Sequence, residues 1–169
     1  VKLALKLLNL FAHKLKNKYI CVMKKYKKLD FKTEDLESLS NSDLKKIADY
    51  ELRQYLLGKQ KNGIYYYCPL KKKNYPLTQM QVAHYIDRGI MNTRYDLTNC
   101  HLVSKQSNEW DAQVQKEGYK SLHHFDYEVF LKNSYGENII DILKSKSKEL
   151  KIFYKKDYIN IINEFRNYK

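Results

Sequence analysis

The sequence predicts an α+β fold in which a small unit of two strands and a helix is flanked by several helices. Two runs rich in strand-forming residues, 63–70 (GIYYYCPL) and 80–86 (MQVAHYI), stand close together in the chain. The segments before and after them carry apolar residues at helical spacing. Strands that are grouped together between runs of helices are typical of the α+β class.

The first 40 residues are expected to form a basic amphipathic helix and a linker. Polar residues at positions 2, 6, 9 and 13 recur at a helical period, which predicts a helix over 2–16. Nine lysines precede the first acidic residue, Asp30, and 30–42 is acidic and rich in serine. This helix could pack on the domain, contact DNA or lie on a membrane. We favour the first two, and no apolar run approaches the roughly 20 residues of a membrane span.

A helix should follow the linker, and the strand pair should follow the helix. Ser40 or Ser42 can cap this helix at its N-terminus, and Gly58 is a suitable end. Its apolar stripe would consist of Leu44, Ile47, Ala48, Leu52, Tyr55 and Leu56. The strands 63–70 and 80–86 are expected to pair as a hairpin with a long loop.

The chain from Cys100 onward predicts a short extended piece (CHLV) and then helices. Ser104 stands at the N-cap position of a helix that should run to Gly118. Further helices are predicted from Leu122, Phe125 and Val129, from the stretch after Gly136, and from Tyr158, Ile161, Ile162 and Phe165. We therefore divide the chain into the N-terminal segment 1–40, a core of 41–120 and a C-terminal helical extension of 121–169.

The charge balance predicts a polyanionic partner. Lys and Arg number 32 against 19 Asp and Glu, a net charge of +13. Such a surface favours nucleic acid or an anionic membrane, although an AT-rich genome would also raise the lysine content. The three cysteines, Cys21, Cys68 and Cys100, form no CxxC pair. We therefore expect no disulfide framework and a cytoplasmic protein.

Three polar residues in the middle of the chain carry the functional prediction. His84 lies in the second strand, Asn99 in the connection that follows it, and Asn108 early in the next helix. Hydrolysis of a phosphodiester needs a group that takes a proton from water and a cation that offsets the phosphate charge. An imidazole can do the first task near neutral pH. A hard divalent cation held by oxygen ligands can do the second.

The order and spacing of His84, Asn99 and Asn108 resembles the HNH, or ββα-metal, nuclease motif in its H-N-N form. The stretches VAHYIDRG, NTRYDLTNCHL and VSKQSN resemble in particular the phage NinG (Rap) recombination-protein family, over roughly residues 44–169. The resemblance implies that His84 is the general base, that Asn99 fixes the loop and strand around it, and that Asn108 binds a divalent cation, Mg²⁺ or Mn²⁺. It also implies an endonuclease that acts on branched recombination or replication DNA.

The chain departs from that family at the cysteine pairs that hold a structural zinc there. The second pair is replaced by Ser104 and Ser107, and Cys68 has no partner cysteine three residues away. A neutral hydroxyl is a poor zinc ligand compared with a thiolate. We therefore expect that zinc is absent and that packing and hydrogen bonds hold this serine knuckle together. Ser104 is expected to cap the helix that carries Asn108.

The metal ligands are incomplete as well. Many HNH nucleases place an acidic residue directly before the general base, and this chain has Ala83 there. Asp87, Asp96 and His101 are further candidate ligands, and the sequence does not choose among them. These gaps leave a second function open, that of a non-catalytic DNA-binding protein on a decayed HNH scaffold.

Basic residues around the motif are the expected contacts to DNA phosphates. They are Arg88, Arg94, Lys71, Lys72, Lys73 and Lys105. Arg88 and Arg94 could instead pair with Asp87 or Asp96, and the lysine run could simply be solvated. No small-molecule cofactor is expected. A homodimer would suit junction resolution, although no heptad supports it.

Overall fold

The computed structural model describes residues 36–108 and 122–168 of the chain. The chain divides into two compact units, Val1–Leu39 and Ser40–Lys169. The expected N-terminal helix and most of the helix expected to reach residue 118 lie outside the described residues. The second unit holds both the expected core and the expected C-terminal extension.

Helix α3 (Asn41–Lys59) begins where the sequence predicts. The hydroxyl of Ser40 accepts a hydrogen bond from the backbone N–H of Asp43 over 3.2 Å, which makes Ser40 the N-cap. The expected apolar stripe is buried, except for the half-buried Tyr55. The helix ends one residue after the predicted Gly58, which stays helical and does not itself take the left-handed conformation of a helix stop.

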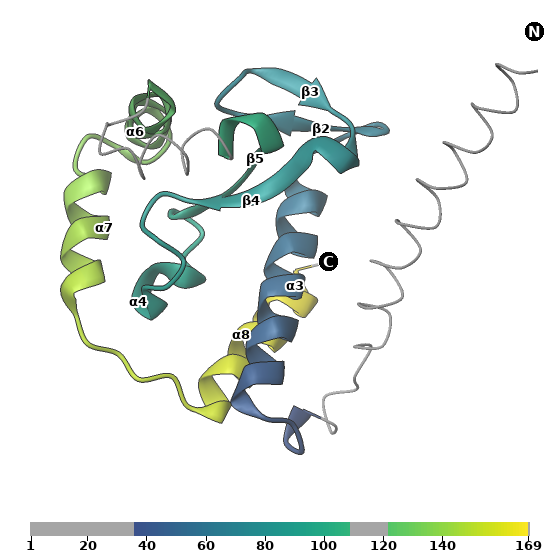
Figure 1. Ribbon diagram of the computed structural model, residues 1–169, viewed down its shortest axis with the longest axis vertical. Coiled ribbons are helices and arrows are strands. Elements are labelled where there is room, and N and C mark those ends of the chain that lie inside the picture. The colour runs from purple at the N-terminus through teal and green to yellow at the C-terminus, as the bar shows by residue number, and fades with distance from the viewer. Residues whose placement is uncertain (1–35, 109–121, 169) are drawn as a thin grey trace, which may run out of the picture. The chain divides into compact units, whose positions relative to one another are not determined.

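The strands form two antiparallel sheets rather than the single predicted hairpin (Figure 1). The first sheet has the order β1-β2-β3, with β1 at Lys61–Asn62, β2 at Tyr65–Cys68 and β3 at Lys73–Tyr75. The second pairs β4 (Met80–His84) with β5 (Cys100–Ser104). The predicted pairing of 63–70 with 80–86 is therefore wrong. The chain reverses directly after β2, in the lysine-rich turn where Lys72 has a φ of 51°. Strand β3 therefore pairs with the edge of β2.

The β4–β5 pair carries His84 at the end of β4, and Asn99 directly precedes β5. Its register pairs Gln81 with Val103, Val82 with Leu102, Ala83 with His101, and His84 with Cys100. A short 3-10 helix, Leu77–Gln79, precedes β4. The connection between the two strands contains the short helix α4 (Met91–Arg94), and residues 105–108 after β5 are helical. The predicted extended piece CHLV is thus the partner of the strand that carries His84.

Three helices complete the unit: α6 (Leu122–Tyr135), α7 (Ile139–Lys148) and α8 (Lys155–Asn167). Helix α8 packs along α3 (Figure 1). The three predicted C-terminal helices are confirmed. The apolar face predicted for α6 is wrong, because Phe125 and Val129 are exposed whereas Tyr127 and Leu131 are buried.

The hydrophobic core gathers around the β4–β5 pair. Buried side chains of α3, β2, α6, α7 and α8 join those of the two strands in one cluster. Helices and small antiparallel sheets around a common core confirm the predicted α+β class. In the described parts of the chain, no helix is both long and apolar enough to cross a membrane.

Candidate functional site

His84 ends strand β4, and its imidazole is anchored at one nitrogen. Nε2 lies 3.0 Å from the backbone carbonyl oxygen of Arg94. Because a carbonyl can only accept, Nε2 must carry the proton in this contact, and Nδ1 keeps its lone pair. Burial lowers the pKa of His84 below its ordinary value of 6.5, and the nearby charges of Arg94 and Arg88 lower it further, against the opposing effect of the carbonyl bond. The ring is therefore neutral at pH 7 and able to accept a proton at Nδ1.

The carbonyl of Arg94 also accepts a hydrogen bond from a thiol. The Sγ of Cys100 lies 3.0 Å from it, and Cys100 is the register partner of His84. Burial raises the pKa of this thiol, so the group stays protonated and can donate. The two donors use both lone pairs of one carbonyl oxygen, which fixes the imidazole against the strand pair.

Asn99 is fully buried and holds the loop that follows β4. Its Oδ1 accepts a hydrogen bond from the backbone N–H of Ile86 over 2.7 Å. Its Nδ2 donates to the carbonyls of Ile86 at 3.2 Å and of Thr93 at 2.9 Å. The side-chain amide of Asn99 thus offers the loop backbone both a hydrogen-bond donor and an acceptor, as the backbone of a neighbouring strand would. Asn99 therefore connects both ends of the 86–93 loop, and Thr93 directly precedes the residue whose carbonyl binds His84.

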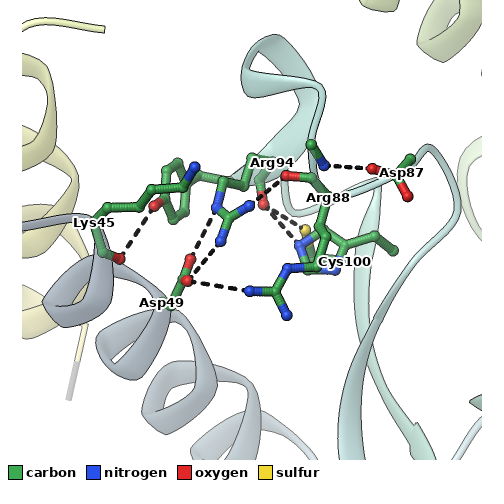
Figure 2. A network of polar contacts seen from close by, with 9 residues as sticks. Lys45, Asp49, Asp87, Arg88, Arg94 and Cys100 are labelled. Atoms are coloured by element: carbon green, nitrogen blue, oxygen red, sulfur yellow. Dashed lines mark hydrogen bonds and ion pairs between the residues drawn. The ribbon is translucent and has the colours of Figure 1, made fainter. Parts of the chain in front are cut away.

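Arg94 is buried beneath this loop and paired with α3 (Figure 2). Only 4% of its side chain is exposed. Its Nε and Nη2 donate to the two carboxylate oxygens of Asp49 over 3.0 and 2.6 Å, and its Nη1 donates to the backbone carbonyl of Arg88. All three donors point inward, so Arg94 cannot reach a DNA phosphate. We therefore correct the expectation that Arg94 binds DNA and that its partner is Asp87 or Asp96.

Arg88 is the solvent-facing basic residue of the same network. Its side chain is 68% exposed, and its Nη2 lies 3.8 Å from Asp49 (Figure 2). An exposed ion pair at this distance contributes little stability. Arg88 is thus free to turn toward a phosphate while its positive charge still acts on His84. Asp49, which organises both arginines, was not identified from the sequence, because it lies 45 residues before Arg94.

Asn108 lies beside β4, but not beside His84. Its Nδ2 donates to Oε1 of Gln81 over 3.2 Å. Gln81 and His84 are three positions apart in one strand, so their side chains project from opposite faces. The structure therefore brings Asn108 to Gln81, a neighbour that the sequence reasoning missed, and not to the imidazole as expected.

His101, expected as a metal ligand, is enclosed by aromatic side chains. Its Nδ1 lies 3.0 Å from the hydroxyl of Tyr127, and its Nε2 lies 2.9 Å from the hydroxyl of Tyr135. The ring of Phe130 packs edge-on against it at 4.8 Å. Burial lowers the pKa of His101 to about 4, and repulsion from His84 in its protonated form adds to this shift. Both nitrogens are used, so we correct the expectation that His101 binds a metal.

The two candidate carboxylates are not arranged around a common point. Asp96 accepts hydrogen bonds from Thr98 at Oδ1 and from the Lys146 ammonium at Oδ2 over 2.5 Å. Burial opposes ionisation of Asp96, but these bonds outweigh it and lower its pKa. Asp87 is exposed and accepts a hydrogen bond from the N–H of Gly89. Within the described residues, no three His, Cys, Asp or Glu side chains are grouped so that they could hold a metal ion.

The serine knuckle is a buried hydrogen-bonded unit. The hydroxyls of Ser104 and Ser107 lie 2.8 Å apart, and the N–H of Ser107 donates to Oγ of Ser104 over 3.4 Å. The N–H of Ser104 donates to the Sγ of Cys68 over 3.2 Å. Ser104 therefore caps the helical residues 105–108 as predicted. Cys68, which lies 36 residues before Ser104 in the chain, contacts the backbone of Ser104.

The predicted lysine contacts lie in two places. Lys71, Lys72 and Lys73 form the turn from β2 to β3, where Lys72 and Lys73 are exposed and Lys71 is half-buried. Lys105 is exposed at the start of the helical residues after β5.

No family model, curated protein or solved structure matches the chain.

Proposed function

We propose that the protein is a DNA endonuclease of the HNH type in which His84 is the general base. One observation carries the proposal: Nε2 of the imidazole lies 3.0 Å from the carbonyl oxygen of Arg94, which leaves the lone pair of the neutral ring at Nδ1. A general base needs this protonation state and a fixed orientation. Asn99 and the Asp49–Arg94 pair hold the backbone that provides both.

In the proposed reaction, Nδ1 of His84 takes a proton from a water molecule that attacks a backbone phosphorus. The 3′ oxygen leaves and takes a proton from solvent, and the negative charge on the phosphate is offset in part by the exposed guanidinium of Arg88. The net charge of +13 attracts DNA through its phosphates, so binding should be steeply salt-dependent and weakly sequence-specific.

The residues described do not fit a resident divalent cation. The family resemblance implies Mg²⁺ or Mn²⁺, which proteins bind through carboxylates and substrate phosphates. Asn108 contacts the amide of Gln81, which offers a neutral oxygen and no carboxylate, and Ala83 offers no ligand atom. A cation that acts beside His84 would take most of its ligands from DNA and water, so we expect weak metal binding in the absence of DNA.

The test is a cleavage assay on matched DNA substrates, namely linear duplex, single strand, flap, and three-way and four-way junctions. Each substrate is incubated with Mg²⁺, with Mn²⁺ and with a chelator. The proposal predicts metal-dependent nicking that is fastest on a branched substrate. Absence of cleavage on every substrate, with DNA binding intact, would reject it.

A second candidate function is DNA binding without cleavage. The separation of Asn108 from His84 and the alanine at position 83 favour it. It predicts salt-dependent DNA binding that is the same in the wild type and in His84→Ala, with no metal-dependent product from either protein.

A further inference from the structure

A cavity of about 310 Å³ lies between α3, β2, β5 and α6, and its lining includes Cys100, the register partner of His84. Its size is at the lower end of small-ligand sites, about 300–1,000 Å³. The side chains that line it include Tyr55, Lys59, Tyr67, Phe130 and Tyr135. Four of its eleven lining residues are Tyr or Phe and one is a lysine, a combination that suits flat rings that carry or adjoin a negative charge.

Two of these rings are open to solvent. Tyr67 is 41% exposed and Tyr135 is 44% exposed, although both are large and apolar. Tyr55 is half-buried, and the ammonium of Lys59 lies 5.5 Å from the centre of its ring. The exposed rings can therefore stack on a ligand, and the exposed lysine can meet an anionic group attached to it.

The amide of Gln60 and the imidazole of His101 in the cavity wall already have hydrogen-bond partners. The amide of Gln60 donates to the carbonyls of Tyr67 and Leu102 and accepts from the N–H of Leu102. Both nitrogens of His101 are bonded to tyrosine hydroxyls. A ligand would thus be held by stacking and charge rather than by a directed set of hydrogen bonds.

We infer that this cavity receives an unpaired base of single-stranded nucleic acid, with Lys59 close to the adjoining phosphate. Bases stack on aromatic side chains whatever their identity, because every base has a π face. The inference rests on the DNA-binding part of the proposed function but not on cleavage. It explains how the protein would select branched DNA, since flaps and junctions expose unpaired bases and an intact duplex does not.

The test compares binding of a single-stranded oligonucleotide of about 12 nucleotides with binding of a blunt duplex, using a fluorescent adenine analogue in the single strand. The wild type should bind the single strand more tightly and quench the analogue. Tyr67→Ala should weaken single-strand binding by about 5-fold to 100-fold and abolish quenching, with duplex binding unchanged. Tyr67→Phe, which keeps the ring, should behave as the wild type, and thermal unfolding should show that both variants are folded.

Lys59→Gln should reduce the salt dependence of single-strand binding, whereas Arg88→Ala should weaken binding of both DNA forms. Equal affinity of the wild type and Tyr67→Ala for the single strand, or no quenching by the wild type, would overturn the inference. Cleavage that persists in that case would leave the proposed function standing. Conversely, quenching by a protein that cleaves nothing would support the base site and reject the endonuclease.

Discussion

The imidazole of His84 is hydrogen-bonded to the backbone carbonyl of Arg94, and the side chain of the same Arg94 is clamped by Asp49. The backbone of one residue thus orients the proposed base, and its side chain ties that backbone to α3. Asn99 fixes the neighbouring Thr93 carbonyl. The orientation of His84 is therefore a property of the fold and not of a mobile loop.

Two arginines of this network should respond in opposite ways to truncation. Arg94→Ala leaves Asp49 without its bidentate partner and should reduce the free energy of unfolding by about 2–4 kcal/mol, at the lower side because Asp49 is 34% exposed. Arg88→Ala should change stability by less than about 0.5 kcal/mol but weaken DNA binding and lower the salt slope by about 1. Urea unfolding and salt titrations of DNA binding check both results. A stable Arg94→Ala that binds DNA weakly would contradict the assignment.

Asn99→Ala should destabilise the protein by about 2–4 kcal/mol. The substitution leaves the N–H of Ile86 and the carbonyl of Thr93 buried without their partner. Urea unfolding measures the loss, and Asn74→Ala, at an exposed position of β3, is the matched control. A loss no larger than that of the control would show that Asn99 does not hold the loop.

Local signals in the sequence predicted most of the helices. The cap at Ser40 and the spacing of Tyr158, Ile162 and Phe165 depend on neighbours within one or two turns, and the structure has both. The cap by Ser104 is local in the same way, because its partner is three residues away. The face of α6 was mistaken, because tyrosine hydroxyls that bond His101 draw Tyr127 inward.

Strand partners and site geometry depend on contacts that the sequence does not encode locally. The strand with His84 pairs with Cys100–Ser104, since the turn at Lys72 gives β2 a nearer partner. Asp49 reaches Arg94 across 45 residues. The position of Asn108 beside Gln81 likewise depends on how the chain after β5 packs on β4.

Stability should fall as the pH falls from about 6.5 toward 4, in part because of His101. Its pKa is about 4 in the folded protein and near 6.5 when unfolded, so within this window the unfolded chain binds more protons. The full shift corresponds to about 3 kcal/mol, present above the unfolded pKa and lost as the pH drops. Urea unfolding at several pH values measures it. His101→Gln, which can still bond the two tyrosines, should show a shallower pH dependence, and an unchanged slope would contradict the prediction.

The purified protein should contain no stoichiometric zinc. The hydroxyls of Ser104 and Ser107 are hydrogen-bonded to each other, and Cys68 is the one cysteine of the described residues that contacts the knuckle. The double variant Ser104→Cys/Ser107→Cys places three thiols together and should bind zinc measurably. Elemental analysis after dialysis distinguishes the two proteins, and one zinc per wild-type chain would refute the prediction.

The most direct test of the account is the single-turnover rate of DNA cleavage by wild type and His84→Ala, with both proteins saturating the same branched substrate in the presence of Mn²⁺ or Mg²⁺. If His84 takes the proton from water, the variant should lose about 10²–10⁴-fold in rate and keep its affinity for DNA. Equal rates for the two proteins, or no metal-dependent product from either, would contradict the account.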